Sequence, residues 1–310
     1  MKQHDGEPEA LDMAKLQDEF RFLAGDAKRV ARENPIPEVQ RVEVEVSDGR
    51  KISALQYDPS KPPAFVFLHG MGLNAHGFDP VVLALDAPAL ALDLPGHGRS
   101  DWREDANYRP DFLAQDVLLA LAQLAPAPFV LVGHSLGGLT AAIAAPALVE
   151  QLRGLVILDI TPSLKPQSDG AEIGDFISGQ RDFATQEEMV DRAIKYGIGT
   201  DRVALTRGVA LNVRQRKAGR WEWAHHLDHM EAQPMQRLGE GSPFAPIWAP
   251  IEGVYQGGTS VSLIRGSEGL GDDAQTASWH DRLPGSEVIT IPGPHNLHEA
   301  SPAELAKSLN

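Results

Sequence analysis

Residues 129–146 read FVLVGHSLGGLTAAIAAP, and the expected architecture of the whole chain follows from this stretch. Residues 129–132 form a short, unbroken apolar run, as expected for a strand buried on both faces of a sheet. Residues 138–145 are small and mostly apolar, which favours a helix packed closely against that sheet. Between them lies Gly133-His134-Ser135-Leu136-Gly137, a G-x-S-x-G motif. When this motif lies in a tight turn between a strand and a helix, it is typical of a nucleophilic serine.

Ser135 is a candidate nucleophile. A serine hydroxyl attacks a carbonyl only when a base removes its proton and the site stabilises the oxyanion that follows. A tight turn lifts the Ser135 side chain above the sheet edge, and crowding within the turn explains Gly133 and Gly137. The amide N–H of Leu136 would then lie at a helix N-terminus, aimed at the developing negative charge. The alternative interpretation is a glycine-rich turn in which Ser135 only caps the helix.

The composition excludes several classes of protein. The chain has 310 residues and a formal net charge of −15, with 42% hydrophobic and 23% charged residues. This length fits one large α/β domain with an insertion, or two domains. The acidic balance argues against nucleic acid or an anionic membrane as a partner. The absence of cysteine excludes disulfides and thiolate chemistry. With no apolar membrane span and no secretory signal apparent, we expect a cytoplasmic location.

Short apolar runs alternate with helical segments along much of the chain. A hairpin is predicted over residues 39–57, with Asp48-Gly49 at its turn. Further buried strands are expected at residues 64–68, 89–93, 129–132, 155–159, 260–264 and 287–291. Such alternation implies right-handed crossovers and a parallel sheet. The predicted division is an N-terminal helical extension (1–38), an α/β core (39–160 and 251–310) and an inserted helical cap, or lid (161–250).

Four motifs, each at a strand end, carry a resemblance to a known family. They are His69-Gly70-Met71-Gly72, Asp93-Leu94-Pro95-Gly96-His97-Gly98-Arg99-Ser100, Gly133-His134-Ser135-Leu136-Gly137-Gly138 and the late His295. Over roughly residues 39–310 the chain resembles the α/β-hydrolase family, and its 93–100 loop is similar to that of small carboxylesterases, thioesterases and carbon–carbon bond hydrolases. The resemblance implies an α/β-hydrolase fold: a mostly parallel eight-stranded sheet with helices on both faces and an inserted helical cap. A helix expected over residues 9–33 lies outside the family's core.

The resemblance also implies roles for individual residues. Ser135 would be the nucleophile, and His295 would be the general base that later protonates the leaving group. The backbone amides of Met71 and Leu136 would form the oxyanion hole. His298 lies three residues beyond His295 and is the rival base. The family places its base just after the glycine turn that follows the last strand, and this position favours His295.

The carboxylate of the expected triad has two candidates. In most of the family the acid follows the seventh strand, three residues after a glycine, and that position is Gly269 in this chain. Glu268 lies one place early. Asp159, at the end of the sixth strand, resembles the acid of esterase-like members that carry an Asp-Ile-x-Pro motif there. Because this strand neighbours the nucleophile strand, Asp159 can reach the same imidazole, and we favour it over the alternative acid Glu268. A capping role is the other interpretation of Asp159.

The predicted cap contains an aromatic, histidine-rich stretch at residues 221–229, WEWAHHLDH. We interpret it as a lid segment that faces the substrate pocket. His225 and His229 are four residues apart, a spacing that suits two metal ligands on a helix face. No third and fourth ligands are apparent nearby, and serine chemistry needs no metal. We therefore predict neither a metal ion nor an organic cofactor.

These patterns together predict a serine hydrolase that cleaves a carboxylic ester or thioester through an acyl-enzyme on Ser135, with a small-molecule acyl substrate. Three alternatives stay open, because a fold does not fix a function. They are a carbon–carbon bond hydrolase of the same fold, a ligand-binding receptor with little turnover, and a cofactor-independent oxygenase. The sequence predicts neither the acyl group nor the oligomeric state.

Overall fold

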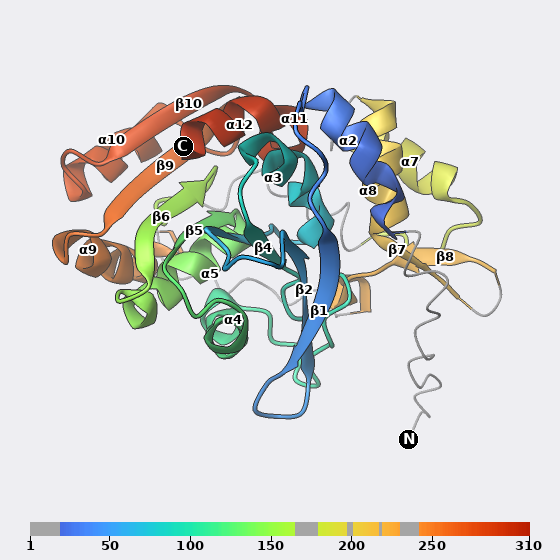
Figure 1. Cartoon of the computed structure of the whole chain (residues 1–310), viewed down its shortest axis with the longest axis horizontal. Coiled ribbons are helices and arrows are strands. Elements are labelled where there is room, and N and C mark those ends of the chain that lie inside the picture. Colours follow the sequence, from blue (N-terminus) through green and yellow to red (C-terminus); the bar gives the residue numbers. More distant parts are fainter. Residues whose placement is uncertain (1–18, 165–178, 197–200, 217–218, 230–241) are drawn as a thin grey trace.

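The computed structural model describes residues 19–164, 179–196, 201–216, 219–229 and 242–310. Its centre is an eight-stranded sheet with the order β1-β2-β4-β3-β5-β6-β9-β10 (Figure 1). The strands are β1 (Val39–Glu45), β2 (Lys51–Tyr57), β3 (Phe65–Leu68), β4 (Ala89–Leu92), β5 (Phe129–His134), β6 (Leu152–Leu158), β9 (Ser260–Glu268) and β10 (Glu287–Pro294). Strand β2 runs antiparallel to both of its neighbours, and the other neighbouring pairs are parallel. The predicted mostly parallel α/β fold is confirmed.

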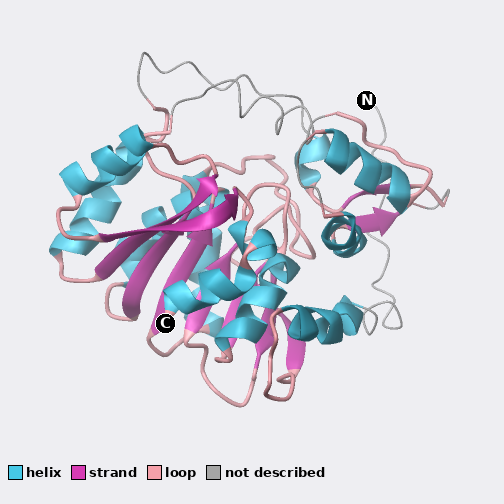
Figure 2. Cartoon of the chain, turned by 90° about the horizontal axis from the view of Figure 1, so that it is seen from above, coloured by secondary structure: helices cyan, strands magenta, loops and turns pink. Residues whose placement is uncertain are grey.

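Helices cover both faces of this sheet (Figure 2). One face packs against α3 (Asp79–Leu85), α11 (Leu297–Ala300) and α12 (Pro302–Leu309). The other packs against α4 (Pro110–Leu124), α5 (Leu136–Ala144), α9 (Trp248–Gln256) and α10 (Asp273–Arg282). Every residue of β3 and β4 is buried, as their uninterrupted apolar sequences require when helices lie on both sides.

Between β6 and α9, the described residues from Phe183 to His229 form a small unit with its own core, which we call the insert. Its elements are α7 (Gln186–Lys195), α8 (Arg202–Leu211), β7 (Val213–Gln215), β8 (Trp221–Trp223) and η4 (His226–His229). Its core consists of Phe183, Met189, Val190, Val209 and Trp223. The antiparallel β7–β8 ribbon was not predicted, because three-residue strands are too short to show a reliable alternation. That the insert covers a substrate pocket stays a prediction.

Two tryptophans lie elsewhere than the sequence suggested. The prediction that the aromatic side chains of residues 221–229 face the pocket is wrong for Trp223, which is buried in the insert's core with its ring edge-on to Phe183. Burial of such a large apolar ring stabilises the small unit more than exposure in a lid would. Trp248, which we assigned to the cap, is buried in the main core beside Trp279. The predicted boundary at residue 250 therefore cuts through α9.

The N-terminal extension packs on the outside of α3. Its described part consists of η1 (Glu19–Phe22) and α2 (Leu23–Arg29), and residues 1–18 lie outside the described residues, as does the first half of the helix predicted there. Leu23 contacts Leu83 of α3 in a small apolar cluster. Helix α2 also lies beside α8 of the insert (Figure 1), where Asp26 forms an ion pair with Arg207 at 2.7 Å.

Candidate active site

Ser135 occupies a strained turn between β5 and α5. Its backbone angles are φ 51° and ψ −118°, a region that residues with a side chain rarely adopt. A Cβ at Gly133 would lie 2.4 Å from the carbonyl oxygen of Gly137, and one at Gly137 would lie 2.2 Å from that of Leu68. Both positions therefore admit only glycine. The Ser135 amide donates to Leu158 O at 3.1 Å, which ties the turn to the end of β6. The predicted strand, turn and helix are present.

The loop after β3 passes directly against this turn. A Cβ at Gly70 would lie 3.3 Å from the Cβ of Ser135. Buried His69 orders the loop: its Nδ1–H donates to Gly70 O at 2.8 Å, and its Nε2 accepts from the Leu94 amide at 2.9 Å. These bonds require the neutral imidazole, and burial accordingly lowers the pKa of His69. Met71 lies in this loop, and Leu136 is the first residue of α5.

His295 and Asp159 form a hydrogen-bonded pair. His295 lies between β10 and α11, and its Nδ1 is 2.7 Å from Oδ2 of Asp159. The Asp159 carboxylate is fully buried, and it also accepts the Gly266 amide at 2.9 Å and the Leu270 amide at 2.8 Å. Three donors satisfy the buried charge. The carboxylate thus holds the Nδ1–H tautomer and leaves Nε2 of His295 as the basic nitrogen.

The arrangement distinguishes the two candidate acids. Glu268 is exposed at the end of β9, opposite Pro294 of β10, and within the described residues no hydrogen bond joins it to His295. A Cβ at Gly269 would lie 2.2 Å from both carboxylate oxygens of Asp159. The carboxylate from β6 therefore fills the space beside position 269. A glycine at position 269 together with an aspartate directly after β6 is the sequence feature that favours Asp159 over Glu268.

Ser135 and His295, the candidate nucleophile and base, are linked only indirectly in the described structure. No hydrogen bond joins the Ser135 hydroxyl to His295 among the described residues, and such contacts often tighten only when substrate binds. His134, the residue before Ser135, contacts His295. Its ring lies 4.5 Å from the His295 ring, and its Nε2–H donates to His295 O at 3.0 Å. Burial, followed by repulsion from His295, lowers the pKa of His134 well below its ordinary value, so the imidazole is neutral.

His298, the rival base, lies in the protein interior. It is fully buried between the rings of Phe78 and His134. Neither of its ring nitrogens has a hydrogen-bond partner in the described part of the chain. Burial, with a smaller repulsion from His295, lowers the pKa of His298 to about 3. An imidazole with so low a pKa is a weak proton acceptor, and without a carboxylate partner it is poorly suited to act as the base.

Replacing His298 by phenylalanine is expected to flatten the dependence of stability on pH. Below pH 6.5 the unfolded chain protonates His298 and the folded chain does not, so folding loses stability as the pH falls towards 3. Each such histidine contributes a slope of about 1.4 kcal/mol per pH unit. Urea unfolding of His298→Phe between pH 6 and pH 4 should show a slope smaller by about that amount, with ester turnover retained.

The matched control is His280→Gln, because His280 is exposed on α10. Its slope should equal that of the unaltered chain. An unchanged slope in His298→Phe would show that the folded protein protonates His298 freely. Loss of turnover in that variant would indicate that His298, and not His295, is the general base.

Two asparagines that sequence reasoning missed connect the loop after β3 to the insert. Asn74 Nδ2 donates to Leu211 O at 3.0 Å, and Asn212 Nδ2 donates to Gly72 O at 2.6 Å. The stretch near His226 contacts the core as well: its amide donates to Gly96 O at 2.7 Å. These contacts join segments far apart in sequence, and no local pattern indicates them.

The histidines of residues 221–229 do not assemble a metal site in the described structure. His225 is buried, and the side chain of His229 lies outside the described residues. Across the described ranges, no three His, Cys, Asp or Glu side chains converge as metal ligands. Within those same ranges, no helix combines the length and the apolar character that crossing a bilayer requires.

The strained Ser135 turn, the hydrogen-bonded pair of buried Asp159 and His295, and this sheet order define a class of protein. The model of the alpha/beta hydrolase family matches residues 65–308, and the chain belongs to this family. It is 37% identical to esterase Rv0045c of Mycobacterium tuberculosis, over 93% of each chain. A solved structure of that esterase covers 97% of this chain and 98% of its own, with a TM-score of 0.79 and 33% identity. The chain is also 27% identical to the mouse sn-1-specific diacylglycerol lipase ABHD11, over 78% of each.

Proposed function

We propose that this protein is a serine esterase that works through an acyl-enzyme on Ser135. In this proposal His295 is the general base, Asp159 orients it, and the amides of Leu136 and Met71 stabilise the oxyanion. The observation that carries the proposal is the 2.7 Å contact between His295 and the buried Asp159 beside the strained Ser135 turn. The similarity to an esterase over nearly the whole chain supports an ester as the substrate.

Acylation begins when Ser135 Oγ attacks the carbonyl carbon of the ester. His295 Nε2 takes the hydroxyl proton, and Asp159 stabilises the imidazolium that forms. The two amide N–H groups hold the negative charge on the carbonyl oxygen. As the tetrahedral intermediate collapses, the carbon–oxygen bond to the alcohol breaks and His295 gives its proton to that oxygen. The acyl group stays on Ser135.

Deacylation repeats the sequence with water as the nucleophile. His295 removes a proton from water, the hydroxide attacks the acyl carbon, and the same amides hold the oxyanion. Ser135 leaves with the proton that His295 returns, and a carboxylic acid is released. Thioesters would follow the same steps with a thiol as leaving group, and the insert would bound the acyl pocket.

A covalent probe and burst kinetics test this proposal together. A fluorophosphonate should form one adduct per chain, and peptide mass mapping should place it on Ser135. A chromogenic acetate ester should release a rapid burst of one nitrophenolate per chain before the steady rate, because the acyl-enzyme accumulates. The burst should disappear in the chain pretreated with the fluorophosphonate.

Other outcomes point to the alternatives. A receptor would bind ligands without adduct, burst or turnover. A carbon–carbon bond hydrolase would turn over a diketone-like substrate faster than any ester. An adduct that maps to another serine would contradict the assignment of Ser135.

A further inference from the structure

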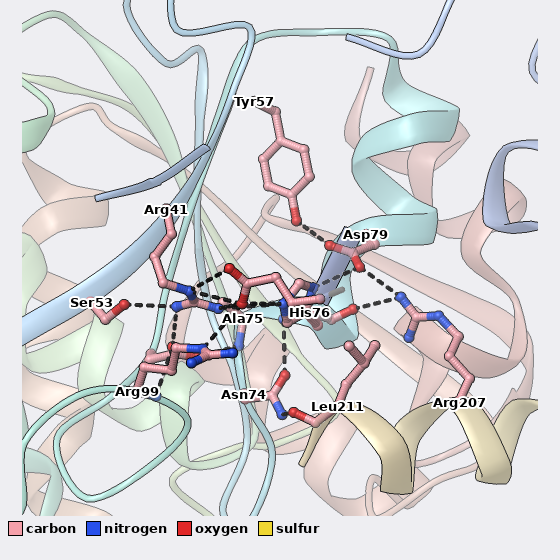
Figure 3. A network of polar contacts seen from close by, with 12 residues as sticks. Arg41, Ser53, Tyr57, Asn74, Ala75, His76, Asp79, Arg99, Arg207 and Leu211 are labelled. Atoms are coloured by element: carbon pink, nitrogen blue, oxygen red, sulfur yellow. Dashed lines mark hydrogen bonds and ion pairs between the residues drawn. The ribbon is translucent and has the colours of Figure 1, made fainter. Parts of the chain in front are cut away.

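A buried network of charges lies beside the loop after β3 (Figure 3). It joins the N-terminal extension, β1, the η2–α3 segment (η2 is Ala75–Phe78), the loop after β4 and α8 of the insert. Its members are the carboxylates of Glu19, Asp26, Asp79 and Asp93, and the cationic groups of Arg41, Arg99, Arg207 and His76. None of these residues takes part in the mechanism proposed above.

Glu19, from the extension, is the carboxylate with the most cationic partners. It is 6% exposed and lies 2.9 Å from Arg41 and 3.1 Å from Arg99, with Nε2 of His76 at 3.3 Å. Burial raises its pKa, but hydrogen bonds from His76 and Arg41 outweigh burial and lower the pKa of Glu19 to about 2. Glu19 is therefore ionised at every pH at which the fold is expected to persist.

Both arginines that form ion pairs with Glu19 also contact Asp93. Arg41 Nη1 lies 2.7 Å from Asp93 Oδ2, and the Arg99 amide donates to the same oxygen at 3.1 Å. The other oxygen, Oδ1, accepts the amide of Ala75 at 2.8 Å. Ala75 directly follows the loop of residues 70–74, so Asp93 fixes the end of that loop.

The insert fixes the same loop from the other side. Asn74 and Asn212 bond it to the end of α8, as described above. Helix α8 is anchored in turn by Arg207, which contacts Asp79 at 2.8 Å. Asp79 also contacts Nδ1 of His76 at 2.9 Å, and Nε2 of His76 contacts Glu19, which closes the network. The loop that carries Met71 is thus fixed at its end by Asp93 and elsewhere by the two asparagine hydrogen bonds to the end of α8. The charge network connects these two sets of contacts.

We propose that Glu19 of the N-terminal extension is a positioning residue for the oxyanion loop, acting through Arg41, Arg99 and Asp93. This inference rests on the proposed function, because it assumes that the Met71 amide stabilises the oxyanion. Nδ1 of His76 faces Asp79, and its Nε2 faces both Glu19 and Arg41. When His76 is protonated, the network balances four negative groups against four positive ones. Removing the charge of Glu19 leaves an excess cation beside Asp93, and the groups that fix Ala75 then rearrange.

The kinetic test is Glu19→Gln, which keeps the size of the side chain and removes its charge. Loss of one oxyanion donor costs about 10²- to 10³-fold in kcat, so a displaced donor should cost about ten- to a hundredfold. Because the oxyanion exists only after attack, kcat for p-nitrophenyl acetate should fall while KM stays within about twofold. Glu33→Gln, an exposed carboxylate of the same extension, should leave both unchanged.

Hydrogen exchange tests the same inference without activity. In Glu19→Gln the amides of residues 70–78 should exchange at least about ten times faster, and those of β5 and α5 at the unaltered rate. If Glu19→Gln does not fold, Arg99→Gln replaces it, because the Arg99 side chain is 26% exposed and contacts Glu19. It should change kcat and loop exchange in the same direction.

The outcomes separate the two proposals. Normal kcat and normal loop exchange in Glu19→Gln overturn the positioning role, whatever the esterase assay shows. Faster exchange throughout the chain also overturns it, because Glu19 would then serve only global stability. Faster loop exchange in a protein without ester turnover supports the positioning of the loop and contradicts the proposed function.

Discussion

Alanine at position 135 is expected to lower kcat for ester hydrolysis by about a millionfold, the scale seen when a serine nucleophile is removed. Without the hydroxyl no acyl-enzyme forms, and only the binding groups and the oxyanion amides act on water. The Ser135 side chain makes no hydrogen bond that caps α5, so Ser135→Ala should fold normally. Steady-state turnover and the burst of a chromogenic acetate ester measure the loss, and circular dichroism with thermal melting measures the fold.

The matched control is Ser278→Ala. Ser278 is a half-buried serine on α10 whose hydroxyl bonds Ser163 at 2.8 Å. Its loss should leave kcat within about twofold, because its hydroxyl bonds Ser163 and none of the proposed catalytic groups in the described structure. Residual turnover above about 1% in Ser135→Ala would contradict the covalent mechanism, because binding and oxyanion groups alone account for far less than that.

Asparagine at position 159 is expected to lower kcat by about 10⁴-fold while the protein stays folded. The Asp159 carboxylate accepts three hydrogen bonds, from His295, Gly266 and Leu270. Oδ2 accepts from both His295 and Leu270, and Oδ1 accepts from Gly266, so the NH₂ group of an asparagine must face either Gly266 alone or the other two donors. If it faces His295, Nδ1 becomes the acceptor and Nε2 carries the proton, which removes the base. Steady-state kinetics across pH 5 to 9 measures the loss.

Glu268→Gln is the paired variant, and its kcat should stay within about twofold because the Glu268 side chain is exposed. The opposite ranking of the two variants would show that the orienting acid comes from the end of β9. Equal losses would show that both carboxylates share the histidine, which their present placement does not favour.

Local chemistry explains why part of this site could be predicted. The turn at Ser135 is specified by glycines that crowd its neighbours and by the apolar strand and helix on either side. The apolar runs of β3 to β6 likewise predict a buried parallel sheet, because a helix-covered strand has no polar face. His295 could be assigned only through the family resemblance, since eleven histidines offer the same side chain.

What could not be predicted depends on contacts between distant segments. Arg207 and Asp26 are 181 residues apart in the sequence, and a charge on a helix surface looks the same whether it is solvated or buried. The burial of Trp223 in the insert's own core depends on Phe183, forty residues earlier. Neither pair of residues is spaced by a helical or strand period, so no periodic pattern in the sequence predicts these contacts.

The place of Asp159 in the chain order has a consequence for protein engineering. Asp159 follows β6 and so precedes the insert, whereas the loop after β9 provides only the amides of Gly266 and Leu270 to its carboxylate. The proposed nucleophile and acid therefore lie together on one side of the insert. A grafted insert would not separate these two groups in the chain. An exchange of the region between residue 161 and α9 would thus leave both groups in place, provided that Arg207 and Asn212, which hold the loop after β3, are kept.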